Sequence, residues 1–117
     1  MSVSILFKNA RLIFPDRVEP ADLRVCDGRI ASIGRALEPE RGDDVQMLGG
    51  RLVAPGCPDI ERLRTLVGEG IPLTRAVYMS TLKGRLEPGA DADLTILSEK
   101  LEVLATFAKG KRRLPEA

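Results

Sequence analysis

A stretch rich in proline and glycine, Arg51-Leu-Val-Ala-Pro-Gly-Cys-Pro-Asp59, divides this sequence into parts with different periodicities. Before it, apolar and polar residues tend to alternate between turn-forming residues, which predicts short β-strands. After it, apolar residues recur at helical spacing as far as Leu82, and the chain then returns to strand-like segments. The fold therefore has to bring two sets of strands together around a helical middle.

The first part predicts strands over residues 3–14, 21–26, 29–33, 45–48 and 51–53, with a loop over 34–44. Asn9 marks a bend or bulge in the first of these. Asp27-Gly28 favours a type I′ hairpin turn, because both central residues of that turn need a positive φ. Gly49-Gly50 is a second hairpin signal, between the strands at 45–48 and 51–53.

The middle predicts a helix from Asp59, which can cap it, to Val67, and a second helix with Pro72 in its first turn. Strands follow over 94–97, 103–108 and 111–114. Neither strand set has enough apolar surface alone, so we expect them to share one core. The prediction is a mainly β protein, with a β-sandwich formed jointly by N-terminal and C-terminal strands and two short helices between them. It is one composite domain, 1–117, made of 1–56, a helical connection over 57–84, and 85–117.

Charge and cysteine content narrow the range of partners. The net charge of +1 gives no strong attraction to nucleic acid or to an anionic membrane, and the basic segment 109–113 lacks the interleaved aromatic residues of a nucleic-acid site. No apolar run approaches the ~20 residues of a membrane-spanning helix, and the N-terminus does not resemble a signal peptide. We therefore expect a cytoplasmic protein in which Cys26 and Cys57 are reduced, buried structural residues.

Several segments resemble the amidohydrolase superfamily of metal-dependent hydrolases. Lys83-Gly-Arg-Leu-Glu-Pro-Gly-Ala-Asp-Ala-Asp-Leu-Thr-Ile-Leu97 is similar to the family's closing segment. Asp27-Gly-Arg-Ile-Ala-Ser-Ile-Gly34 and Gly50-Arg-Leu-Val-Ala-Pro-Gly56 match its opening strands. Gly70-Ile-Pro-Leu-Thr-Arg-Ala-Val77 looks most like N-acetylglucosamine-6-phosphate deacetylases, while isoaspartyl dipeptidases and dihydroorotases share much of the frame. The resemblance implies a small β-sandwich that accompanies a TIM barrel.

The resemblance also shows what is missing. In the family, Pro-Gly-apolar-apolar-Asp-x-His-x-His leads into the barrel. Here Pro55, Gly56 and Asp59 fit, but Glu61 and Leu63 hold the two histidine places, and the chain contains no histidine. In the family, a whole barrel with all its metal ligands would normally lie between Asp59 and roughly Arg62. The chain thus looks like a hydrolase with its barrel excised, and we expect no catalytic, cofactor-binding or metal-binding residue and no bound cofactor.

Asp91 and Asp93 could be paired catalytic carboxylates, but their place in a turn favours bonding to nearby backbone amides. Three functional hypotheses stay open: a non-catalytic structural or association module, one component of a hydrolase whose barrel is supplied in trans, and a small ligand-binding domain. Loss of the barrel should uncover apolar surface, so we expect a homo-oligomer. We expect Leu63, Leu66, Val77 or Met79 to lie near the contact.

Overall fold

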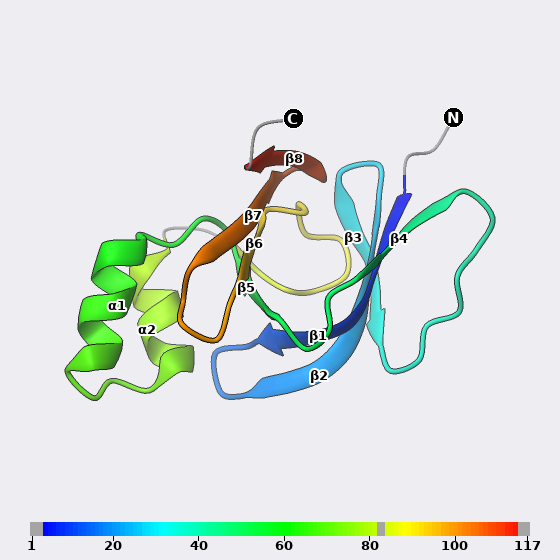
Figure 1. Cartoon of the computed structure of the whole chain (residues 1–117). Helices are drawn as coiled ribbons and strands as arrows, with labels where there is room; N and C mark the ends of the chain where they lie inside the picture. Colours follow the sequence, from blue (N-terminus) through cyan, green and yellow to red (C-terminus); the bar gives the residue numbers. More distant parts are fainter. Residues whose placement is uncertain (1–3, 82–83, 115–117) are drawn as a thin grey trace.

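The computed structural model describes residues 4–81 and 84–114, and contains a single sheet and two helices (Figure 1). Val3 and Leu82, at the limits of predicted elements, lie outside the described residues. The elements are β1 (Ser4–Ile13), β2 (Val18–Cys26), β3 (Arg29–Gly34), β4 (Asp43–Met47), β5 (Leu52–Pro55), α1 (Ile60–Gly68), α2 (Leu73–Ser80), β6 (Leu94–Leu97), β7 (Val103–Ala108) and β8 (Lys111–Leu114).

The long strand β1 organises the sheet. One edge of β1 pairs antiparallel with β2, which pairs with β3 across the Asp27-Gly28 turn. Both turn residues have positive φ, 50° and 83°, so the predicted hairpin is confirmed. The other edge of β1 pairs in parallel with β4 along its first half and with β5 along its second half. From β5 the sheet continues through β6 and β7 to β8.

The predicted hairpin at Gly49-Gly50 is wrong, because β4 and β5 lie end to end along β1 rather than side by side. Asn9, with φ 58°, forms the predicted bulge in β1, where the register shifts between Phe7 and Ala10. The Gly50 amide donates to the Asn9 carbonyl at 2.6 Å. Both glycines have positive φ. They carry the chain past the bulge, and its direction along β1 does not reverse.

The N-terminal and C-terminal strands share one core, as the alternation predicted. β5 and β6 pair antiparallel, and apolar residues from β1, β2 and β3 pack against those of β5, β6 and β7. Phe7 of β1 and Phe107 of β7 meet edge to face, with ring centroids 5.2 Å apart. The mainly β class is thus confirmed, and the two layers belong to one hydrogen-bonded sheet whose halves enclose this core.

The helices cover the other face of β5 and β6, at the end of the molecule away from β3 and β4 (Figure 1). Asp59 caps α1 as predicted, accepting a hydrogen bond from the Arg62 amide at 3.2 Å, whereas Pro72 precedes α2 instead of lying in its first turn. Leu63 and Val77 are fully buried in this second apolar cluster. The helices thus fold back over the sheet, and the expected oligomer contact near them stays a prediction.

The chain leaves the strand region and returns to it at one point. A Cβ atom placed on Gly84 would lie 2.6 Å from the Gly56 nitrogen and 2.9 Å from the Pro55 carbonyl carbon. Gly84 has φ 137°, a conformation that other residues rarely adopt. The chain therefore leaves the sheet at Gly56 and returns at Gly84, and these two points touch.

Gly84→Ala should destabilise the protein by about 2 kcal/mol or more, because both the backbone conformation and the contact with Gly56 exclude a methyl group. Gly89→Ala is the matched control. Gly89 also has positive φ, 93°, but nothing lies within 4 Å of an added Cβ, so about 1 kcal/mol is expected. Denaturant midpoints measure both effects, and equal losses in the two variants would contradict the close contact.

The buried carboxylate of Asp22 connects the β1 bulge to the loop after β3. Asp22, which is 4% exposed, accepts from Lys8 Nζ at 2.7 Å, from the Asn9 amide at 2.9 Å and from the Leu37 amide at 2.8 Å. Burial alone would raise the pKa of Asp22, but these hydrogen bonds outweigh it, so the pKa lies below the ordinary value of 3.8 for an aspartate. The ionised form is thus favoured in the folded state.

Asp22→Asn should lower stability by about 1–3 kcal/mol at neutral pH, since Lys8 loses its charged partner. Because the folded-state pKa is lowered, the carboxylate stabilises the protein above the unfolded pKa near 3.8 and loses that effect as the pH falls through the folded value. The difference between variant and wild type should therefore vanish in acid. Asp16→Asn, at an exposed aspartate, is the charge-matched control, and an equal loss there would refute the role of Asp22.

Candidate functional site

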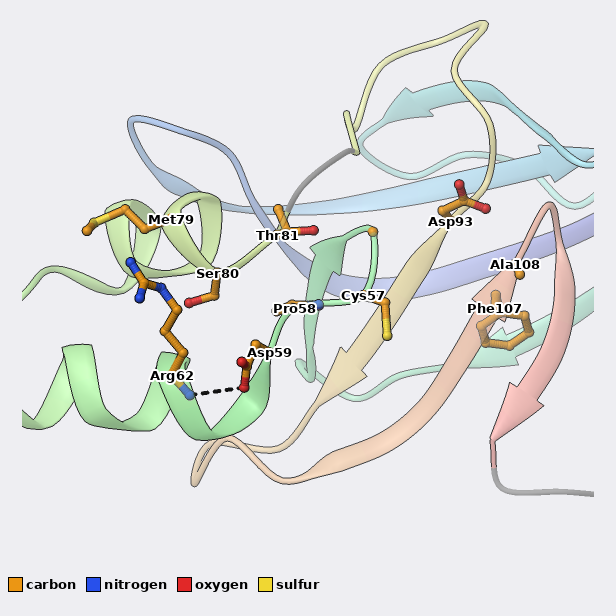
Figure 2. Close-up of a pocket in the computed structure, with 11 residues that line it drawn as sticks. Cys57, Pro58, Asp59, Arg62, Met79, Ser80, Thr81, Asp93, Phe107 and Ala108 are labelled. Atoms are coloured by element: carbon orange, nitrogen blue, oxygen red, sulfur yellow. Dashed lines mark hydrogen bonds between the residues drawn. The ribbon is translucent and has the colours of Figure 1, made fainter.

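An open hollow with a volume of about 960 Å³ lies where the chain leaves the sheet for the helices (Figure 2). It occupies the place at which the resemblance would attach a barrel. Its lining comes from the exit segment, the start of α1, the end of α2 with the residue after it, the residue before β6, and the end of β7. These residues are Gly56, Cys57, Pro58, Asp59, Arg62, Met79, Ser80, Thr81, Asp93, Phe107 and Ala108.

Polar groups of the hollow hold its elements together. The Asp59 carboxylate caps α1, and the Asp59 amide donates to the Ser80 carbonyl at 2.9 Å, which joins the start of α1 to the end of α2. Ser80 Oγ donates back to the Ala76 carbonyl at 2.7 Å. On the sheet side, Thr95 Oγ1 donates to the Gly56 carbonyl at 2.8 Å. These groups satisfy backbone atoms that the junction would otherwise leave unpaired.

The positions that correspond to the family's two histidines do not converge. Glu61 is exposed on α1, as expected for a single carboxylate on a helix face, whereas Leu63 is fully buried beneath the same helix. One position thus faces solvent and the other faces the apolar cluster. Within residues 4–81 and 84–114, no group of three His, Cys, Asp or Glu residues is arranged to hold a metal ion.

Asp93 has the structural role that the turn suggested, but with a distant partner. Its Oδ1 accepts a hydrogen bond from the Lys109 amide at 2.8 Å, so it fastens the β7–β8 turn to the segment before β6. Asp91 is exposed and forms a backbone bridge with Arg29 of β3. The expected bond to a nearby amide is therefore replaced by a contact between turns, which sequence spacing does not reveal.

The cysteines differ from the expectation of buried thiols. Cys57 is exposed and lines the hollow, whereas its neighbours Gly56 and Pro58 are buried (Figure 2). Cys26 is half-buried, and partial burial together with the carboxylate of Asp27 raises the pKa of its thiol. In the described part of the chain, no hydrogen bond connects Cys57 to a base. The arrangement offers no activated nucleophile.

No protein-family model matches the chain, and no curated protein matches it either. Solved structures with similar segments are hydantoinases and other amidohydrolases. D-hydantoinase from Thermus sp. is 35% identical over 44% of this chain and 11% of its own, with a TM-score of 0.41. L-hydantoinase from Arthrobacter aurescens is 33% identical over 48% of this chain and 12% of its own, with a TM-score of 0.42.

An amidohydrolase structure is 22% identical over 66% of this chain and 22% of its own, with a TM-score of 0.44. The chain therefore matches only a small share of these enzymes, 11–12% of the two hydantoinases.

Neither helix in the described residues is long and apolar enough to cross a membrane.

After incubation with excess zinc and then dialysis, the protein should retain no stoichiometric metal, because the acidic and thiol groups of the junction do not converge. Elemental analysis measures this directly. About one tightly held zinc per chain would contradict the prediction. Cys57→Ser would then show whether the exposed thiol is a ligand, since only a site that uses this sulfur would lose the metal.

Proposed function

We propose that the chain is a non-catalytic β-sandwich domain of the amidohydrolase type, with a structural or association role and without the catalytic barrel. The resemblance of its opening and closing segments to that family supports this proposal. The finer assignment, to the deacetylases of N-acetylglucosamine-6-phosphate, depends on residues 70–77. We also propose a cytoplasmic location, and no nucleic-acid or membrane partner.

The contact between Gly56 and Gly84 is the observation that carries the proposal. An inserted domain requires its two connections to leave the host at neighbouring points, and such points tolerate insertions of very different sizes. Here the exit and the return touch, and they lie within the segments that resemble the family's barrel boundaries. A barrel or a pair of short helices can therefore follow the same strand without changing the sheet.

The junction also argues against catalysis by this chain. A metal-dependent hydrolase needs ligands that converge on an ion, which then lowers the pKa of a bound water. In this chain the Asp59 carboxylate is engaged in capping, Glu61 is exposed and Leu63 is buried. Asp59 and Leu63 thus stabilise the helical connection instead.

The second candidate is a hydrolase component whose barrel is supplied in trans. The open hollow favours it, because Cys57 and Met79 are both exposed there, beside the exit from the sheet. A barrel polypeptide seated at this end would cover both side chains.

Purified protein should hydrolyse N-acetylglucosamine-6-phosphate and isoaspartyl dipeptides only at the background rate, with or without added zinc, because it lacks a metal-activated water and a nucleophile–base pair. A whole deacetylase is the positive control. Activity that follows the protein peak through repurification would refute the proposal.

The same assay tests the second candidate. A deacetylase barrel produced without its own small domain would be mixed with this chain. Activity in the mixture alone, lost with Cys57→Arg and kept with Val45→Arg on the distant strand β4, would favour the component role.

A further inference from the structure

The edge strands of the sheet differ in how well they are protected against pairing with a strand of another chain. At β3, the Ile30 amide donates to the Ala90 carbonyl and the Gly89 amide donates to the Ile30 carbonyl, both at 2.8 Å, so the loop before β6 covers that edge. At β8, Lys111, Arg112 and Arg113 are exposed, and their like charges oppose self-pairing. In the described part of the chain, β4 pairs with β1 alone. On its other edge the Asp43 amide donates to the Glu40 carbonyl at 3.0 Å, and the edge is open from Val45 to Met47.

The open edge at β4 has two exposed apolar side chains, and Asp44 is an exposed charge beside them. Val45 is 41% exposed and Met47 is 60% exposed, and their spacing places both on one face of the strand. The strand contains no proline and no lysine. Asp43 offers little repulsion, because Arg24 Nη2 at 3.1 Å and Ser4 Oγ at 2.7 Å bind its carboxylate from inside the sheet. Such an edge is a template for another strand.

From this contrast we infer that β4 pairs antiparallel with β4 of a second copy of the chain, about a two-fold axis at Val45. The Leu48 amide donates to the Lys8 carbonyl of β1 at 2.9 Å. Because backbone groups alternate along a strand, those of Val45 and Met47 point to the open edge. Val45 then exchanges its N–H and C=O bonds with Val45 of the second copy, and the two sheets become one.

Charge selects the antiparallel arrangement. It places Asp44 opposite Gln46 of the second copy, and Asp43 opposite Met47. Within one chain, Gln46 Nε2 already donates to Asp44 Oδ2 at 3.1 Å, so the same pair can form across the axis. A parallel arrangement would set like carboxylates side by side, which is destabilising. On the outer face, the valines and methionines of both copies form one apolar cluster.

This inference deepens the association role proposed above and rests on it. Its test measures mass and amide exchange, whereas the tests above measure hydrolysis, so the two can fail separately. It also places the contact away from the helices, where Leu63 and Val77 are buried and Met79 is exposed.

Sedimentation velocity over a micromolar-to-millimolar series tests the contact. Wild type should pass from monomer to dimer mass. Val45→Lys should weaken dimerisation at least about tenfold, because it sets two charges together at the axis. Met79→Lys is the matched control, since it adds the same charge at a similarly exposed apolar residue on α2, and should behave as wild type. Circular dichroism checks that both variants are folded.

Amide exchange on the wild-type protein tests the same contact without any variant. The Val45 and Met47 amides should gain protection as concentration rises, while the Leu48 amide, bonded to β1, should not change. A monomer at every concentration would overturn the inference. Dissociation by Met79→Lys but not by Val45→Lys would place the contact on the helices and overturn it too. Masses that grow beyond the dimer would indicate head-to-tail pairing of β8 with β4 instead.

Discussion

The pairing of β5 with β6 is the contact on which the rest of the structure depends. Both strands are buried along their whole length, and their two faces carry the two apolar clusters. Val53 and Ile96 face the core shared with β1 and β2, while Leu52 and Leu97 face the helices. Strands from the two ends of the sequence are thus adjacent, and the chain between them has to leave and return at one edge. The touching glycines are a consequence of this constraint.

Helices α1 and α2 cover a face of the sheet that would be exposed without a barrel or another covering element. The outer face of β5 and β6 is apolar, and burying such a face contributes roughly 25 cal/mol per Å². Helices α1 and α2 bury it with residues such as Leu63 and Val77. Short helices need their end groups satisfied, and Asp59 and Ser80 do this at the junction. The polar residues next to the hollow therefore stabilise helix ends, which explains why they do not form a reactive cluster.

The sequence predicted strands and turns well where residues close together in the sequence determine them. The strands at 94–97, 103–108 and 111–114 have their predicted bounds, and Asp27-Gly28 forms its turn because positive φ at both residues is a local requirement. Gly49-Gly50 carries a similar signal, but its outcome depends on the distant bulge at Asn9. The exposure of Cys57 and the bond from Lys109 to Asp93 also depend on which turns meet in space, and no sequence spacing encodes that.

Strand β4 and the junction beside the helices are two separate surfaces. The resemblance alone predicts exposed apolar residues at the junction. Losing a barrel predicts bare surface at the junction, yet the helices bury the face of β5 and β6 there, and Val45 and Met47 are exposed on β4. In Figure 1, β4 and the helices lie at opposite ends of a molecule that measures 45 Å along its longest axis. A second copy at β4 would leave the hollow open. Pairing of two chains and docking of a barrel are therefore compatible, and an assembly of two small domains can present two hollows at its far ends.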